Sequence, residues 1–220
     1  MFENAKWIRI PAEIGTVLPE FRFILQVQKA VDRVTVYASA MGVYDLLVNG
    51  KKVGDNFMAP GCTSFRKRLQ YQAYDITDAI EPQTSISLVC GTGWAVGYYG
   101  YIERRFSASD HVSVIAEIVI EYTDGTELRI GTDESWEVFT SQILYSELYF
   151  GETFDLCAKI EKVGNALIDN DSKPVLVPQV GERVCEHERI AAKKIIKTPK
   201  NVTVIDFGQN LGGYVEVRIK

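Results

Sequence analysis

Apolar and polar residues alternate with a period of two along several stretches of the chain, which is typical of β-strands that bury one face. Two pairs of these stretches are joined by Asn49-Gly50 and Asp124-Gly125, and such dipeptides favour hairpins because Asn, Asp and Gly tolerate positive φ. The pattern therefore predicts two β-hairpins. The residues expected to face inward are Val34, Val36, Ala38, Val43, Leu46, Val48, Val114, Ala116, Ile118, Ile120, Tyr122, Leu128 and Ile130.

Further stretches extend the β pattern beyond these hairpins. Residues 84–94 are more continuously apolar, which indicates a central strand, and residues 143–155 predict one more strand. Helical signals are weak. Residues 74–80 predict a short helical turn, and residues 188–197 combine high helix propensity with neighbouring strand patterns, so we favour a strand there. Many short strands with turn signals between them predict an all-β fold, a jelly-roll-like β-sandwich.

A composition shift divides the chain. Residues 161–182 are rich in Gly, Asn, Asp, Ser and Pro, which is typical of a linker between a first domain, 1–160, and the remainder, 183–220. That remainder is too short to bury an independent core. Its last residues, 214–219, alternate again and would leave an unpaired strand edge. We expect that the chain is the front part of a longer polypeptide, or that these strands complete the first domain; pairing with a neighbour would give a homodimer.

Composition and charge exclude several classes of function. The 220 residues carry a formal net charge of −5 with both signs mixed and no basic stripe, which argues against a nucleic-acid partner. No apolar run reaches the length of a membrane helix, and the first residues lack a secretory signal, so we expect a cytoplasmic protein. Cys62, Cys90, Cys157 and Cys185 form no CxxC pair. We expect reduced thiols and neither a metal nor another cofactor.

Five segments, taken together and in this order, resemble the N-terminal domain of bacterial α-L-rhamnosidases, which are inverting glycoside hydrolases. They are "GVYDLLVNGKKVGD", "APGCTSFRKRLQYQAYDIT", "GTGWAVGYYGY", "GETFD" and "VIDFGQNLGGYVEVRI". The chain departs from the family in having Cys62 where many relatives have tryptophan, and Thr92 where the family has an acidic residue. The resemblance spans nearly the whole chain and implies that the last segment begins a second β-sandwich.

The resemblance also implies where catalysis takes place. Inverting glycosidases need two carboxyl groups about 6.5–9.5 Å apart, and in this family they lie in an (α/α)6 barrel downstream of these domains. The parent enzyme would hydrolyse terminal α-L-rhamnose from glycosides. This chain would be a non-catalytic portion that contains no catalytic residues and braces that barrel, its partner in the same polypeptide. The alternative is an independent module that binds L-rhamnose or rhamnosides.

The aromatic residues of "GTGWAVGYYGY" allow two interpretations. Trp94, Tyr98 and Tyr99 are candidates for a carbohydrate-binding platform, because aromatic faces stack on the C–H faces of sugars. The same residues, with Tyr101, could instead cover the end of the β-core. The alternatives predict different effects of removing Trp94: lost sugar binding in the first case and lost stability in the second.

Two polar groups are candidates for structural or interdomain contacts. Glu152 and Asp155 are three residues apart and would point to opposite sides of a strand, so an Asx-type turn or an interdomain contact is favoured over paired catalysis. Asp206, Gln209 and Asn210 lie among glycines, which favours a tight turn in which Asp206 accepts hydrogen bonds from backbone amides. The alternative is a contact with the catalytic domain or the rim of its substrate site.

Overall fold

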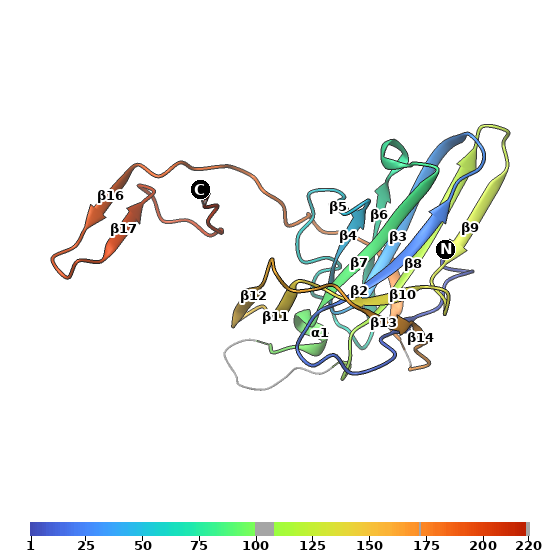
Figure 1. Cartoon of the computed structure of the whole chain (residues 1–220), viewed down its shortest axis with the longest axis horizontal. Coiled ribbons are helices and arrows are strands. Elements are labelled where there is room, and N and C mark those ends of the chain that lie inside the picture. The colour runs from blue at the N-terminus through green and yellow to red at the C-terminus, as the bar shows by residue number, and fades with distance from the viewer. Residues whose placement is uncertain (100–107, 172, 219–220) are drawn as a thin grey trace. The chain divides into compact units, whose positions relative to one another are not determined.

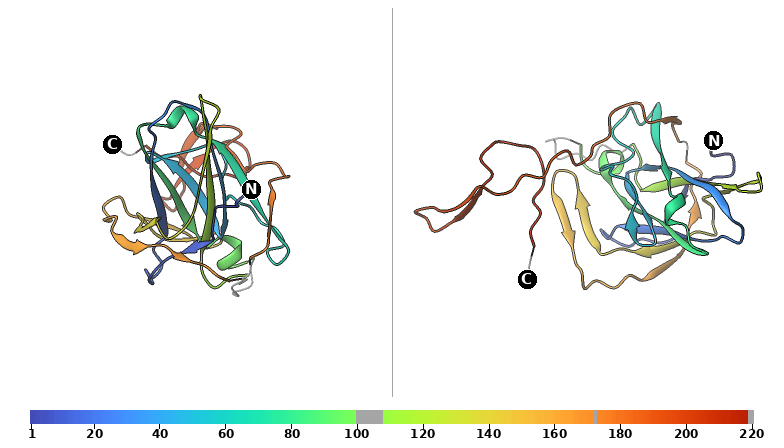
Figure 2. Two further views of the ribbon diagram at one scale, coloured as in Figure 1. Left: turned by 90° about the vertical axis from the view of Figure 1, so that its right-hand side faces the viewer. Right: turned by 90° about the horizontal axis from the view of Figure 1, so that it is seen from above.

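The computed structural model describes residues 1–99, 108–171 and 173–218, which form two compact units, Met1–Val184 and Cys185–Lys220. The first unit is a β-sandwich whose two main sheets face one another (Figure 1, Figure 2). This confirms the predicted all-β sandwich. No helix among the described residues is long and apolar enough to cross a membrane.

Each main sheet is mostly antiparallel. In spatial order, the first contains β14 (Leu167–Ile168), β1 (Ile8–Arg9), β8 (Ser113–Tyr122), β3 (Val31–Met41), β6 (Arg68–Asp75) and β15 (Val175–Pro178), with β9 (Glu127–Gly131) paired to β8. The second contains β13 (Lys162–Asn165), β10 (Glu137–Thr140), β2 (Pro19–Gln26), β7 (Gln83–Gly91), β4 (Val43–Val48) and β5 (Lys51–Lys52). Only β15, which runs parallel to β6, departs from the antiparallel arrangement of these pairs.

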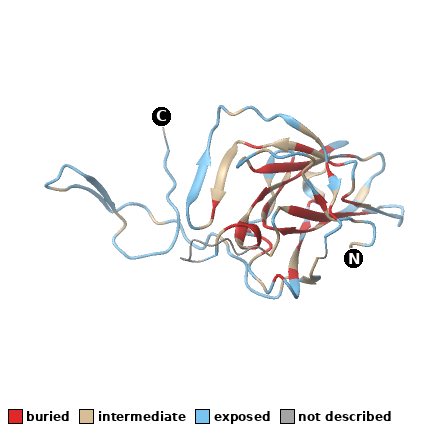
Figure 3. Ribbon diagram, turned by 90° about the horizontal axis from the view of Figure 1, so that it is seen from below, coloured by how far each residue is buried: buried red, intermediate tan, exposed pale blue. Residues whose placement is uncertain are grey.

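The hydrophobic core lies between the two sheets, where Figure 3 shows the buried strands in red. The inward faces of β3 and β8 follow the predicted alternation, and β7 is an interior strand as expected. Two residues are exceptions to the predicted inward set. Val43 lies on the opposite face of β4 from the buried Leu46 and Val48, because it is an odd number of residues from each inward residue Tyr44, Leu46 and Val48. Leu128 is exposed on β9, which pairs only with β8 in the described sheets. The largest fully buried side chains are Trp136, Phe21, Ile8, Leu25, Leu46, Leu69, Ile86, Leu88, Ile118, Ile120, Glu117 and Val34.

The two predicted hairpin turns form with different backbone geometry. Asn49 and Gly50 both adopt positive φ, at 50° and 74°, as the two-residue turn between β4 and β5 requires. Between β8 and β9 only Gly125 does so, at 80°. There the Tyr122 amide donates to the Thr126 carbonyl across a three-residue loop, which needs one glycine in the left-handed region.

Two segments differ from the sequence-based expectation. Residues 161–182 contribute β13, β14 and β15 to the sandwich. Residues 143–155 form a hairpin, β11 (Ile143–Glu147) and β12 (Gly151–Phe154), rather than one strand, because Gly151 turns the chain with φ 89°. The short helical turn predicted within residues 74–80 is confirmed as a 3-10 helix, η1 (Thr77–Ala79), although Tyr74 and Asp75 belong to β6.

The second unit is one hairpin, formed by β16 (Lys194–Lys197) and β17 (Thr203–Asp206). The strand favoured for residues 188–197 therefore forms only over its last four residues. Residues 214–218 are not in a strand, since no described segment supplies a partner; Ile219 lies outside the described residues. None of the described residues from 185 onward is buried.

Candidate functional site

The aromatic loop predicted from the sequence follows β7 and contains a four-residue helix, α1 (Gly93–Val96). Trp94 is half-buried and packs against a small cluster that includes Met41, Phe65 and Leu69. The Tyr98 ring meets the edge of Phe150, with ring centroids 5.0 Å apart. The Trp94 indole is therefore used in packing, whereas Tyr98 contacts the β11–β12 hairpin.

The remaining aromatic residues of this loop have different surroundings. Tyr99 is exposed and hydrogen-bonds Cys62, whose pKa is raised by burial and lowered to a lesser degree by that bond. Tyr101 lies outside the described residues. Trp94, Tyr98 and Tyr99 thus contact three different groups, so the described part of the loop combines packing contacts with one exposed ring.

A buried carboxylate fixes this loop to the hairpin. Glu147, at the end of β11, accepts a hydrogen bond from the Tyr98 amide at 3.2 Å. Thr92 donates to the Ser146 carbonyl at 3.3 Å. A side chain on Gly97 would place its Cβ 2.4 Å from Glu147 Oε2, so only glycine leaves room for the carboxylate. Gly97 therefore allows the aromatic loop to pack closely on β11.

The two polar candidates form local turns. Asp155 follows β12, and its carboxylate accepts the Cys157 amide at 2.8 Å. Glu152 lies on β12 with an exposed side chain. In the second unit, Asp206 accepts the Gly208 amide at 2.7 Å, as an Asx turn requires. Both aspartates therefore make the kind of turn considered from the sequence. Gln209 and Asn210 are exposed.

A polar groove of about 380 Å³ opens on the first unit, and sequence reasoning missed it. Its buried wall is formed by Asn56 and Gln72, which are 7% and 5% exposed. Both amides donate to Gln179 Oε1, from Gln72 at 3.1 Å and from Asn56 at 3.4 Å. The groove is lined by Val53, Gly54, Asp55, Asn56, Tyr71, Gln72, Ala73, Tyr74, Asp75, Pro178, Gln179 and Arg183.

The chemistry of this groove suits a neutral ligand rich in hydroxyl groups. Burial raises the pKa of Tyr74, so its hydroxyl stays protonated. An ion pair between Arg183 and Asp55, 2.6 Å long, adds a donor and an acceptor at the exposed rim. Amide, carboxylate and guanidinium groups beside aromatic rings can bind the hydroxyls and the C–H faces of a sugar.

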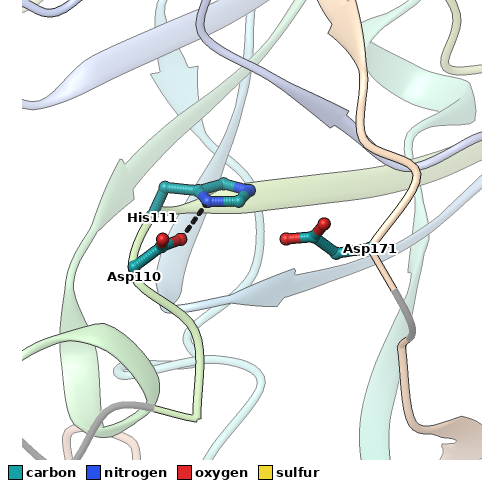
Figure 4. Close-up of side chains that lie close together, drawn as sticks. All are labelled: Asp110, His111 and Asp171. Atoms are coloured by element: carbon teal, nitrogen blue, oxygen red, sulfur yellow. Dashed lines mark hydrogen bonds and ion pairs between the residues drawn. The ribbon is translucent and has the colours of Figure 1, made fainter.

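A second polar cluster has the composition of a metal site (Figure 4). Ligand atoms of Asp110, His111 and Asp171 lie within 4.8 Å of one another. However, both ring nitrogens of His111 already face carboxylates, with Nδ1 2.5 Å from Asp110 Oδ1 and Nε2 2.9 Å from Asp169 Oδ2. A metal would have to displace one of these contacts. The arrangement is better explained as an ion-pair network.

The side chain of Lys173 also belongs to this ion-pair network, through its contact with Asp169. Its ammonium lies 2.6 Å from Asp169 Oδ2, and both side chains are nearly buried. Burial alone would raise the pKa of Asp169, but the hydrogen bonds from Lys173 and the other donors outweigh it and lower the pKa to about 2. Asp169 therefore stays ionised at neutral pH and links the segment after β14 to the loop before β8.

Cys185 and His187 are two residues apart in the sequence and lie near each other in the structure. Sulfur and Nε2 are 4.0 Å apart. Among the described residues no third metal-ligating side chain joins them in a cluster. This pair supplies too few ligands for the tetrahedral sites that cysteine and histidine usually form.

Comparisons with known proteins agree on one family. The family described as "Alpha-L-rhamnosidase N-terminal domain" matches residues 29–194. An α-L-rhamnosidase of Streptomyces avermitilis is 33% identical over 205 residues, covering 87% of this chain and 20% of that protein. One from Formosa agariphila is 27% identical over 232 residues, covering 96% of this chain and 25% of that protein. The chain thus spans a quarter or less of these relatives.

Solved structures give the same result. The native α-L-rhamnosidase of Aspergillus terreus matches with a TM-score of 0.85 and 27% identity, over 96% of this chain and 26% of that one. The Streptomyces avermitilis α-L-rhamnosidase complexed with L-rhamnose matches with a TM-score of 0.78 and 28% identity, over 91% of this chain and 21% of that one. The matched region in each is again a small part of a larger chain.

Proposed function

Because the chain belongs to the α-L-rhamnosidase N-terminal domain family, we propose that it is the non-catalytic N-terminal portion of an enzyme that hydrolyses terminal α-L-rhamnose from glycosides. Its role is to brace the catalytic domain, an (α/α)6 barrel elsewhere in the same polypeptide. The relatives support this, since they are α-L-rhamnosidases of which this chain matches 20–25%.

The observation that carries this proposal is the exposure of the β16–β17 hairpin. Ile195 pairs with Ile205 and Ile196 with Val204, and successive pairs point to opposite faces of the hairpin. Both faces are therefore apolar, yet no described residue of this unit is buried. An isolated two-stranded hairpin is marginally stable at best. This supports the proposal that residues from 185 onward begin a second β-sandwich, completed by further strands.

The proposal predicts a clear division of activity. We expect residues 1–220 to show no hydrolysis of an aryl α-L-rhamnoside, whereas the longer polypeptide from the same reading frame hydrolyses it with saturable kinetics. Release of the aryl group, followed by absorbance, measures both. Saturable hydrolysis by residues 1–220 alone, or an inactive longer polypeptide, would contradict the proposal.

The polar groove favours a second function, binding of a rhamnosyl sugar by this domain. Its amides, the buried Asn56 and Gln72 and the half-buried Gln179, supply the donors and acceptors that sugar hydroxyls need. Binding here would hold the substrate near the catalytic domain. The aromatic loop is the competing location, since Trp94, Tyr98 and Tyr99 are the residues that the sequence favours for stacking.

Calorimetric titration with L-rhamnose separates these locations. If the groove binds the sugar, we expect heat of binding that is lost in Gln179→Ala and kept in Trp94→Ala, because Trp94 packs against the Met41 cluster. Far-ultraviolet circular dichroism checks that both variants fold. The reverse result assigns the sugar to the aromatic loop, and a flat trace for the unmodified protein removes sugar binding.

We also propose a cytoplasmic location. The four cysteines are free in the structure, which fits a reducing compartment. Subcellular fractionation tests this, and recovery of the protein outside the cytoplasm would contradict it.

A further inference from the structure

Exposed apolar side chains of the first unit gather around the β11–β12 hairpin. Phe150, Phe154 and Leu156 are 58%, 53% and 77% exposed, and Tyr99 and Tyr149 are also exposed. These five residues are called the hairpin face below. Soluble proteins rarely leave a contiguous group of large apolar side chains in water unless another molecule covers it.

The strands of the β11–β12 hairpin pair only with each other and with no strand of the two main sheets among the described residues. β11 and β12 form a two-stranded sheet of their own, outside the two main sheets in Figure 1. One side is fixed by the aromatic loop, through the Tyr98 amide on Glu147 and the Tyr98 ring on Phe150. All four residues of β12 are exposed (Figure 3). A two-stranded sheet gains its stability from packing, so the exposed side of this hairpin requires a covering surface.

The hairpin face continues toward the place where the chain leaves the first unit. Tyr98 contacts Phe150, and the next residue, Tyr99, hydrogen-bonds Cys62. Five residues before Cys62, Phe57 pairs in a β-bridge with Val184, the last residue of the unit. These contacts and the segment from Phe57 to Cys62 thus connect the hairpin face with Val184, where the first unit ends.

We propose that the hairpin face is the docking surface for the catalytic domain of the same polypeptide. This inference rests on the proposed function, in which the chain is part of a longer enzyme. It is supported by the relatives, which are about four to five times longer than the matched region, and by the exposure of all four residues of β12. Apolar side chains at such a face favour a permanent contact rather than a transient one.

Hydrogen exchange tests the interface directly. We expect amides of residues 143–156 to exchange at least ten-fold more slowly in the longer polypeptide than in residues 1–220. The double variant Phe154→Ser, Leu156→Ser should remove this protection in the longer polypeptide. It should leave the unfolding temperature of residues 1–220 unchanged, because both side chains already face solvent.

A matched control uses exposed apolar residues away from the hairpin. Ile24 on β2 and Leu128 on β9 are 38% and 42% exposed. Ile24→Ser, Leu128→Ser should alter neither the protection of the hairpin nor the unfolding temperature. Equal exchange in the two forms would overturn the inference. So would protection in residues 1–220 that depends on protein concentration or on added L-rhamnose, which would identify a second copy or a sugar as the occupant.

The proposed function and this interface can fail separately. Hydrolysis of an aryl rhamnoside by the longer polypeptide without protection of the hairpin would keep the function and overturn the interface. Protection of the hairpin in a longer polypeptide without that activity would overturn the function and keep the interface with another domain.

Discussion

Replacing Trp136 by alanine is expected to lower the free energy of unfolding of the first unit by about 3–5 kcal/mol. Trp136 precedes β10 and is fully buried, with its ring stacked on Phe23 at a centroid distance of 5.5 Å and an interplanar angle of 23°. Alanine would leave a cavity between the two sheets. Denaturant unfolding followed by circular dichroism measures the loss.

Trp136→Phe is the matched control. It keeps an aromatic ring against Phe23, and it removes no hydrogen bond, because the indole N–H has no partner among the described residues. We expect this variant to lose clearly less stability than the alanine variant. Equal losses for the two variants would mean that packing of an aromatic ring does not explain the stability that Trp136 contributes. A loss below about 1 kcal/mol for Trp136→Ala would contradict the place of Trp136 in the core.

The strands that the sequence predicts well are the long ones beside the core. β3 and β8 are 11 and 10 residues long, and one face of each lies against the opposite sheet. Burial of that face requires an apolar residue at every second position, as Val34, Val36 and Ile118 illustrate. The hairpins could be predicted from their turn residues, because residues such as Asn49 and Gly50 tolerate the positive φ that both adopt here.

Short strands at sheet edges could not be predicted in the same way. β13, β14 and β15 have only two to four residues and lie at the ends of their sheets. Edge strands tolerate Gly and Pro, as Gly164 in β13 and Pro178 in β15 show. Residues 161–182 therefore have the composition of a linker although they complete the sandwich.

The polar groove and the ion-pair network could not be predicted from the sequence either. Asn56 and Gln179 are 123 residues apart, and His111 and Asp169 are 58 apart. Nothing in their local sequence links them, because the contacts depend on β15 pairing with β6 and on β14 pairing with β1. The aromatic loop was identified from its composition, whereas its attachment to Glu147 needed the tertiary structure.

Glu117 illustrates how strand alternation alone misleads. On β8 it lies opposite the inward set that contains Ile118, so the pattern predicts a solvent-facing carboxylate. It is instead fully buried, because the N-terminal segment crosses over it. The carboxylate accepts the Phe2 amide at 3.0 Å and the Asn4 amide at 3.1 Å. Gly131 makes the crossing possible, since a Cβ there would lie 2.2 Å from the Asn4 carbonyl oxygen.

Removing this carboxylate is expected to cost about 1–3 kcal/mol of unfolding free energy. Glu117→Ala leaves the Phe2 and Asn4 amides without their acceptor and removes one partner of the exposed Arg129 guanidinium, which lies 3.3 Å from Oε2. Hydrogen exchange should show faster exchange at residues 2–6, and denaturant unfolding gives the energy. Glu127→Ala is the matched control: Glu127 pairs with the same arginine at 2.6 Å but is exposed, so its removal should cost only about 0–1 kcal/mol. Equal costs for the two variants would show that Glu117 does not anchor the N-terminal segment.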